Sequence, residues 1–247
     1  MIYFISDIHL GAKYILNPRQ HEQRVVDFLD TIAAEATELY LLGDILDYWF
    51  EYRNVVPRGY VRFFGALARL ADRGIKIVWF TGNHDIWLYD YLRDEIGIEV
   101  VDAPYIVREI DGKQFILAHG DRIVRGKASF RFICRLFRCR ICCKLYSAIH
   151  PRWTIPFAHW WSGSSRGSNA ADNTMGIEKS VEKIAQEVEQ LPLDDIKPDF
   201  VVMGHYHIAV DTGLPHHTAR LVMLGDWFDR TTYARFDGKV LTLKEIK

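Results

Sequence analysis

Five apolar segments of this chain each end in a short cluster of polar side chains. The clusters are SDIH, GD, GNHD, AHGD and GHYH, and each follows a run of residues apolar enough for a buried strand. In layered α/β folds, sites form where the carboxyl ends of strands meet their loops. If the five strands point the same way, their polar clusters converge at one edge of the fold.

The spacing of apolar residues indicates which segments are strands and which are helices. It predicts strands over 1–6, 39–44, 75–85 and 199–207, and helices over 20–37, 58–73 and 175–190. Asp-Gly pairs favour tight hairpin turns, one inside a hairpin over 105–121 and one at 237–238 inside a closing meander. Alternating strands and helices followed by hairpins predict an α/β fold with two packed sheets and helices outside them. We expect a single domain over 1–247.

Composition excludes some classes and leaves others open. Apolar residues make up 49% of the 247 residues and the net charge is −1, which is ordinary for a globular protein and says nothing about partners. The amino terminus has no secretory pattern and no run of about twenty apolar residues occurs, so we expect a cytoplasmic protein. The four cysteines lie within ten positions, Cys134 to Cys143, which favours reduced thiols over a disulfide framework.

The polar clusters contain seven side chains of the kinds that bind metals. They are Asp7, His9, Asp44, Asn83, His119, His205 and His207. Carboxylate, imidazole and amide donors without a thiolate suit Mn, Fe, Zn or Co. Seven ligands exceed what one ion with an open position needs, but they fit two ions if one carboxylate bridges, the arrangement used for attack on phosphorus. Each motif alone also has a structural interpretation, such as a turn or a buried histidine. To exclude a metal site, the structural interpretation would have to be correct for every motif at once.

The order of the motifs resembles that of the calcineurin-like metallophosphoesterases. SDIHLG, LLGD, TGNHD, AHGD and MGHYH match the family order and span residues 6–207. The resemblance implies a four-layer αββα sandwich and two divalent metal ions, for which we expect Mn²⁺. One metal would be held by Asp7, His9, Asp44 and His207. The other would be held by Asp44, Asn83, His119 and His205, so that Asp44 is the bridge.

The resemblance also implies catalytic roles for Asp44 and His84. The family histidine that follows the asparagine lies over the leaving group, where an imidazole can protonate an alkoxide or stabilise charge in the transition state. We expect Asp85 to hold the other nitrogen of the His84 ring. The alternative is a histidine that faces solvent.

A basic insertion lies between the HG and GHYH motifs, at about 122–171. It carries ten Lys and Arg residues and no Asp or Glu. Phe130, Ile133, Phe137 and Ile141 follow helical spacing, and Arg131, Arg135 and Arg138 follow it one position on, which predicts a basic amphipathic helix. The favoured interpretation is a lid that binds an anionic lipid and touches the inner membrane surface. A nucleic-acid surface is less favoured. The third interpretation is a helical cap that packs on the core.

Within the superfamily, the chain resembles the lipid A pathway enzymes that hydrolyse UDP-2,3-diacylglucosamine. The shared features are SDIHLG, LGDILDYWF, the basic helical insertion and LGDW. The resemblance implies cleavage of the substrate diphosphate to UMP and diacylglucosamine 1-phosphate by a hydroxide that bridges the metals. By position, Arg122, Arg166 and Asn169 are candidates for contacts with this anionic nucleotide-lipid.

Two departures keep an alternative open. Typical members of that group have Arg where this chain has His84, and SSRGSNAADN lacks the expected lysines. An alkoxide leaving group needs an acid more than a phosphomonoester does. The alternative is therefore a phosphodiesterase or phosphatase acting on a nucleotide or another phospholipid. Two further hypotheses are less favoured. A nuclease of the superfamily commonly works with further domains, and a non-catalytic scaffold of this fold usually loses metal ligands, whereas all seven are present here.

Overall fold

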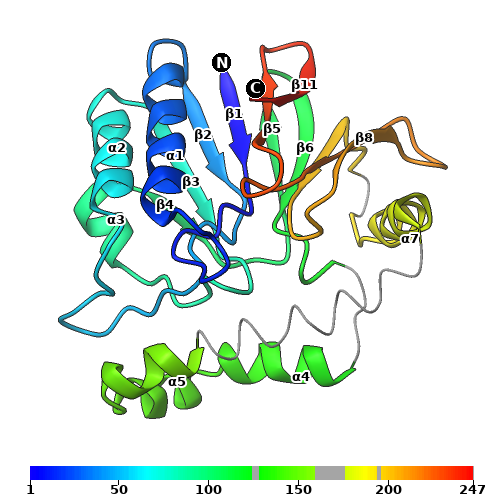
Figure 1. The fold of residues 1–247 in the computed structure, drawn as a ribbon. Helices are drawn as coiled ribbons and strands as arrows, with labels where there is room; N and C mark the ends of the chain where they lie inside the picture. The colour runs from blue at the N-terminus through cyan, green and yellow to red at the C-terminus, as the bar shows by residue number, and fades with distance from the viewer. Residues whose placement is uncertain (124–127, 159–175, 194–195, 247) are drawn as a thin grey trace.

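The first of two stacked sheets contains the amino-terminal strand. The computed structural model describes residues 1–123, 128–158, 176–193 and 196–246. In spatial order, the first sheet consists of β11 (Leu241–Glu245), β10 (Thr232–Phe236), β1 (Ile2–Ile5), β2 (Glu38–Leu41), β3 (Lys76–Phe80) and β4 (Glu99–Val101). Strands β1 to β4 run parallel, and β10 pairs antiparallel with β1 on one side and with β11 on the other. The carboxyl ends of β1, β2 and β3 therefore lie at one edge, the lower edge in Figure 1.

The second sheet is also parallel at its centre. Its spatial order is β5 (Ile106–Ile110), β6 (Lys113–Ala118), β7 (Phe200–Met203), β9 (Arg220–Leu224) and β8 (Ala209–Gly213). Strands β6, β7 and β9 are parallel, and the edge strands β5 and β8 are antiparallel to their neighbours. The predicted hairpin turn between β5 and β6 is confirmed, because Asp111 and Gly112 both have the positive φ that such a turn requires.

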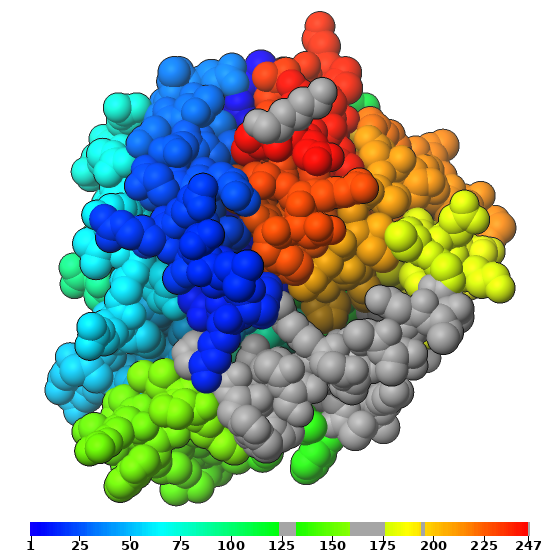
Figure 2. Space-filling view, viewed as in Figure 1, coloured from blue at the N-terminus to red at the C-terminus, as the bar shows by residue number. Residues whose placement is uncertain are grey.

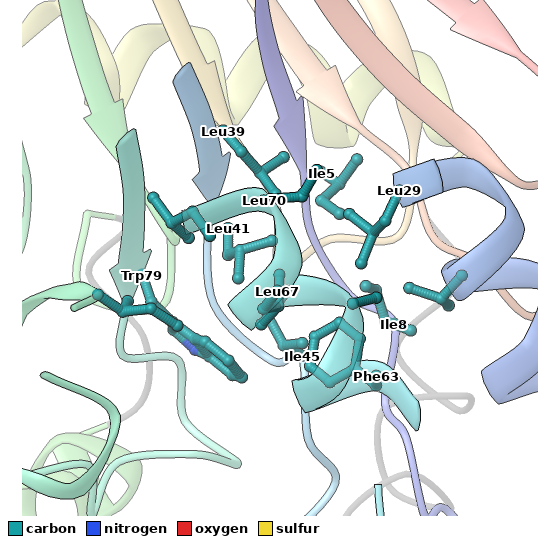
Figure 3. Packing of buried hydrophobic residues seen from close by; sticks show 14 of the residues in the cluster. Ile5, Ile8, Leu29, Leu39, Leu41, Ile45, Phe63, Leu67, Leu70 and Trp79 are labelled. Carbon is teal, nitrogen blue, oxygen red and sulfur yellow. The ribbon is translucent and has the colours of Figure 1, made fainter. Parts of the chain in front are cut away.

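Helices cover the outer face of each sheet, which completes the predicted αββα sandwich. Helices α1 (Pro18–Ile32), α2 (Val61–Asp72) and α3 (Tyr91–Ile96) lie on one side, and α7 (Ile177–Glu189) lies on the other (Figure 1). Figure 3 shows how Leu29 of α1 and Leu67 of α2 pack against Ile5 and Leu41 of the first sheet. Strands that are apolar on both faces explain this architecture, since both faces of each sheet are buried.

A second apolar layer fills the space between the two sheets. Phe4 of β1 stacks on Phe115 of β6 with ring centroids 5.9 Å apart, and Phe236 of β10 packs edge-on against Phe115 at 5.0 Å. All three rings are fully buried. This layer fixes the two sheets against each other, so the loops at their carboxyl ends have defined relative positions.

The structure differs from the expected order in three places. The predicted closing meander is only partly correct: β10 and β11 form the expected hairpin around Asp237 and Gly238, but β9 belongs to the second sheet and β10 to the first. The sequence prediction also missed three elements, helix α3 with the strand β4 that follows it, and strand β8. These are short elements whose apolar residues are too few to set a period, so packing against larger neighbours decides them.

The prediction of a single amphipathic helix in the insertion is also wrong. Two helices form instead, α4 (Ala128–Phe137) and α5 (Arg140–Ser147), and residues 151–158 are helical as well. Helix α4 ends at Phe137, and Cys139, the residue before α5, has an extended backbone conformation. As a result Phe137 and Ile141 do not share one continuous stripe. We call residues 128–158 the lid helices, and they lie across the lower end of the molecule in Figures 1 and 2.

One side of the lid helices packs on the loops that follow β2 and β3. Phe137 and Tyr146 contact Trp87 at centroid distances of 5.6 Å, and the Trp87 indole donates a hydrogen bond to the Phe137 carbonyl at 2.8 Å. The Tyr48 and Tyr146 hydroxyls lie 3.1 Å apart. The alternative interpretation of the insertion, a helical cap that packs on the core, therefore describes part of its surface.

Within the described residues, no helix is long and apolar enough to cross a membrane.

Candidate metal centre

The structure brings the seven predicted ligands to one edge of the sandwich. Asp7 and His9 follow β1, Asp44 follows β2 and Asn83 follows β3 in the first sheet, while His119 follows β6 and His205 and His207 follow β7 in the second. Because both sheets have their parallel strands pointing to this edge, five loops meet between the two layers.

The first group of side chains gathers around Asp7. The His207 Nε2 atom lies 3.1 Å from Asp7 Oδ1, and His9 Nε2 lies 3.8 Å from the same oxygen. The His9 and His207 Nε2 atoms are 3.3 Å apart. These three residues are close enough to share one ion.

The second group gathers around Asp44, which also reaches the first. The His119 Nε2 atom lies 3.4 Å from Asp44 Oδ2 and 3.3 Å from the Asn83 Oδ1 atom. Asp44, His119 and His205 together offer ligand atoms within one ion's reach. Asp44 Oδ2 is also 3.8 Å from His9 Nε2. Asp44 therefore lies between the two groups, the position that a carboxylate bridging two ions would need.

The donor set fits a pair of divalent ions. The Asp7 Oδ1 atom is fully buried and accepts no hydrogen bond from the part of the chain that the structure describes, although buried carboxylate oxygens are normally paired. The His9 and His207 Nε2 atoms face each other at 3.3 Å, close enough for both to bind one cation. The mixture of nitrogen and oxygen donors without thiolate agrees with this.

The electrostatics of the site favour a bound cation. Burial would raise the pKa of Asp44, but the charges of His119 and His84 outweigh burial and hold its pKa well below the usual range. Burial also opposes protonation of His119, yet Asp44 and Asp7 raise the pKa of His119 to about 10. The carboxylates thus create a strongly negative potential in a dry site.

Backbone conformation at the site is unusual. Asp7, His9, Asp44, His205 and His207 all have φ between 52° and 71°, in the left-handed region that non-glycine residues rarely adopt. Such conformations cost roughly 1–3 kcal/mol each and persist only where the surroundings hold them. Hydrogen bonds from the Asp7 amide to the Gly43 carbonyl (3.1 Å) and from the His9 amide to the Asp44 carbonyl (2.9 Å) provide that support.

His84 lies at the rim of the centre, and Asp47 orients it. The His84 Nε2 atom is 4.0 Å from Asp44 Oδ2, while its Nδ1 atom lies 3.1 Å from the Asp47 carbonyl oxygen and 3.5 Å from the Asp47 carboxylate. Asp47 Oδ1 is also 3.4 Å from His9 Nδ1. Sequence reasoning missed Asp47, and its only signal was a second Asp three positions after Asp44.

The expectation that Asp85 holds the His84 ring is wrong. The Asp85 carboxylate is fully buried and accepts hydrogen bonds from the Gly82 amide (2.7 Å), the Ile45 amide (2.9 Å) and the Trp79 indole (3.2 Å). Because these backbone donors belong to the loops that carry Asp44 and Asn83, the Asp85 carboxylate fixes the two loops in place.

We expect Asp47→Asn to lower kcat about 10- to 100-fold, the usual cost of losing a partner of a metal-binding histidine. The asparagine keeps the shape but loses the negative charge that orients the Nδ1 atoms of His9 and His84. Steady-state hydrolysis of bis-p-nitrophenyl phosphate measures the effect, with metal content determined in parallel. Asp90→Asn, in the loop before α3, is the control, and wild-type turnover by Asp47→Asn would contradict the orienting role.

Of the three predicted substrate contacts, only Arg122 lies in the described part of the chain. Its guanidinium group is 2.9 Å from Asp102. Arg138 reaches the same carboxylate at 3.4 Å, as well as Asp121 at 3.5 Å and the Gly82 carbonyl at 3.4 Å. Arg138, expected on the outer basic face of the insertion, is instead a link from the lid helices to the rim of the centre. Arg166 and Asn169 lie outside the described residues.

The comparison with protein families decides the classification. The model of the calcineurin-like phosphoesterase family matches residues 1–209, which include all seven ligand candidates. The chain belongs to the calcineurin-like phosphoesterase family. For this calcineurin-like phosphoesterase, the family and the clustered His and Asp side chains together support divalent metals as cofactors.

Three curated relatives of this calcineurin-like phosphoesterase share one name. A UDP-2,3-diacylglucosamine hydrolase of Porphyromonas gingivalis is 40% identical over 257 residues, covering 100% of this chain and 97% of that protein. Proteins of the same name from Aeromonas hydrophila and Nitrosococcus oceani are 29% and 26% identical, covering 92% and 91% of this chain and 90% and 86% of theirs. The similarity therefore extends through the insertion as well as the metal centre.

Proposed function

We propose that this protein hydrolyses the diphosphate of UDP-2,3-diacylglucosamine to UMP and diacylglucosamine 1-phosphate. The observation that carries the proposal is the 40% identity over the whole chain to a relative named for hydrolysis of this compound. The two groups of ligating side chains that share Asp44 support it, since such centres act on phosphate esters. The chain would work as one domain with the lid helices as its insertion.

Two divalent ions, which we propose to be Mn²⁺, would be held by the seven ligands with Asp44 between them. When bound, they would lower the pKa of a water molecule and neutralise charge on phosphoryl oxygens. The loops after β1, β2 and β7 hold their ligands in strained backbone conformations, so the ligand positions are set before substrate arrives.

His84 and Asp47 would act on the substrate side of the centre. Asp47 lies beside the His84 Nδ1 atom, while Nε2 lies 4.0 Å from Asp44 Oδ2, so Nε2 is the nitrogen that would reach a phosphate at the centre. A protonated His84 would donate a hydrogen bond to a phosphoryl or leaving-group oxygen there. Arg122 supplies a positive charge near Asp102, and we propose that it contacts the substrate together with Arg166 and Asn169.

The outer surface of the lid helices supports a place for this protein at the cytoplasmic face of the inner membrane. Ile141 is 71% exposed, Leu145 67% and Trp153 68%, which is unusual for large apolar side chains. Exposed cations flank them in the sequence, namely Arg135, Arg140, Lys144 and Arg152. Apolar residues flanked by cations suit an anionic lipid surface, where both attractions add.

We expect the triple variant Ile141→Ser, Leu145→Ser and Trp153→Ser to bind vesicles of anionic phospholipid at least about tenfold more weakly. Each substitution removes apolar area that the lipid would cover, at roughly 25 cal/mol per Å². Vesicle co-sedimentation measures the change. Val61→Ser, at an exposed apolar position on α2, is the matched control. Equal sedimentation of the triple variant and wild type would contradict the membrane role of the lid helices.

The function is tested by incubating the purified protein with UDP-2,3-diacylglucosamine and Mn²⁺ in detergent micelles. Bis-p-nitrophenyl phosphate and p-nitrophenyl phosphate are assayed in parallel. Release of UMP at a rate well above turnover of the generic esters is the expected result. Turnover of the generic diester or monoester without UMP release would retain the metal centre and favour a phosphodiesterase or phosphatase for another nucleotide or phospholipid.

A further inference from the structure

A polar residue begins the buried face of α1. His21 stands one helical turn before Val25 on that face, and it is buried although histidine is polar. Its Nε2 atom lies 2.8 Å from the carbonyl oxygen of Ile8. Because a carbonyl oxygen only accepts hydrogen bonds, Nε2 carries the ring proton and donates it to Ile8. Burial lowers the pKa of His21, so the ring is neutral when it makes this contact.

Ile8 lies between two candidate metal ligands. Asp7 and His9 have φ angles of 53° and 52°, so the backbone is in the left-handed region on both sides of Ile8. The Ile8 side chain is fully buried in the same apolar cluster as Leu29 of α1 (Figure 3). Because peptide groups are planar, the orientation of the two groups that flank Ile8 sets the directions of the Asp7 and His9 side chains.

The carbonyl groups of this loop show what His21 contributes. Within the described residues, backbone amides donate to the neighbours of the Ile8 carbonyl, namely Trp227 to Asp7 (3.2 Å), Ala12 to His9 (3.1 Å) and Asp47 to Leu10 (3.0 Å). The Ile8 carbonyl accepts its hydrogen bond from the His21 side chain instead. A buried carbonyl that loses its donor is costly, so without the imidazole the peptide group after Ile8 would be driven to rotate towards another donor.

We propose that His21 is a positioning residue for the metal centre, whose imidazole holds the Ile8 carbonyl and so keeps the Asp7 and His9 side chains directed at one ion. This inference rests on the metal centre of the proposed function but not on its substrate. Helix α1 gives the donor a fixed position, because the residues that follow His21 on the same face are buried against the first sheet. Groups that orient metal ligands in this way control metal affinity without touching the ion.

Metal binding by variants of His21 tests this role. The metal-free full-length protein is titrated with Mn²⁺ by calorimetry, and Co²⁺ absorption spectra report on the ligand arrangement. We expect His21→Leu to weaken Mn²⁺ binding at least about tenfold and to change the Co²⁺ spectrum, the usual effect of losing a group that orients metal ligands. His21→Gln keeps a nitrogen donor near the position of Nε2 and should restore most of the affinity. His21→Asn, whose amide is too short to reach Ile8, should bind Mn²⁺ as weakly as His21→Leu.

A control variant separates ligand positioning from a general loss of stability. Ile32→Ala removes buried apolar volume from the last turn of α1, so it should lower the melting temperature and leave Mn²⁺ affinity unchanged. Wild-type Mn²⁺ affinity in His21→Leu, or equal losses in His21→Gln and His21→Asn, would overturn the role of the hydrogen bond. If His21→Leu does not fold, the comparison of glutamine with asparagine decides. Absence of UMP release by wild type would refute the proposed substrate, whereas the metal titrations decide the role of His21 independently.

Discussion

Asp44→Ala is expected to lower phosphodiester hydrolysis at least about a thousandfold and to reduce bound metal. Each ion contributes several kcal/mol of charge stabilisation, and about 1.4 kcal/mol corresponds to a factor of ten in rate. Asp44 lies within reach of both ligand groups, so its loss affects both ions together. Turnover of bis-p-nitrophenyl phosphate and elemental analysis of the purified variant measure the two effects.

Asp44→Asn separates the charge from the shape of this side chain. The Asp44 Oδ1 atom accepts a hydrogen bond from the His84 amide at 2.8 Å, and an asparagine oxygen can still accept it. We therefore expect Asp44→Asn to fold like wild type while losing nearly as much activity as Asp44→Ala. Asp27→Asn, at an exposed position on α1, controls for the change in net charge. Near-wild-type turnover with a full metal load would refute Asp44 as the bridge.

Gly204→Ala is expected to damage both the fold and the metal centre. A Cβ atom at this position would lie 2.0 Å from the Ser6 Oγ atom and 2.3 Å from the Asp7 Oδ2 atom, far inside van der Waals contact. Ser6 cannot yield easily, because its hydroxyl donates to Asp7 at 2.7 Å or to the Leu42 carbonyl at 2.9 Å. Overpacking of this kind typically costs about 1–3 kcal/mol of folding free energy.

Thermal denaturation and metal content together measure the Gly204→Ala effect. We expect a lower melting temperature and a loss of metal, because Asp7 must move away from His207. Gly213→Ala is the matched control, since a Cβ atom there meets nothing within 4 Å. An unchanged melting temperature with full metal content would show that the loop after β7 can shift without disturbing Asp7.

The fold class was predictable from the sequence because long apolar strands dominate it. The runs ending in Ile5, Leu41 and Phe80 are buried on both faces, so their apolar pattern is continuous and easily recognised. The passage from β9 to β10 was not predictable in this way, because strand patterns do not say which sheet a strand joins. The break after Arg138 was missed because helical spacing continues through it.

The candidate ligands were predictable because each stands directly after a strand, but their supporting residues were not. Asp47 contacts two histidines from a loop whose path depends on Asp85 beneath it. Arg138 turns inward because Asp102 and Asp121, distant in sequence, lie beside it. Such contacts come from tertiary packing, and no local pattern records them.

The pairing of β1 with β10 has a consequence for how this chain acquires activity during synthesis. Ile2 lies opposite Phe236, and the Trp227 amide donates a hydrogen bond to the Asp7 carbonyl at 3.2 Å. The residues synthesised first therefore complete their contacts only when residues close to the carboxyl terminus have been synthesised. Contacts of such large sequence separation form slowly, and a nascent chain leaves one edge of β1 unpaired until then. On the ribosome, the amino-terminal ligands would be made first but could close around their ions only after almost the whole polypeptide has emerged.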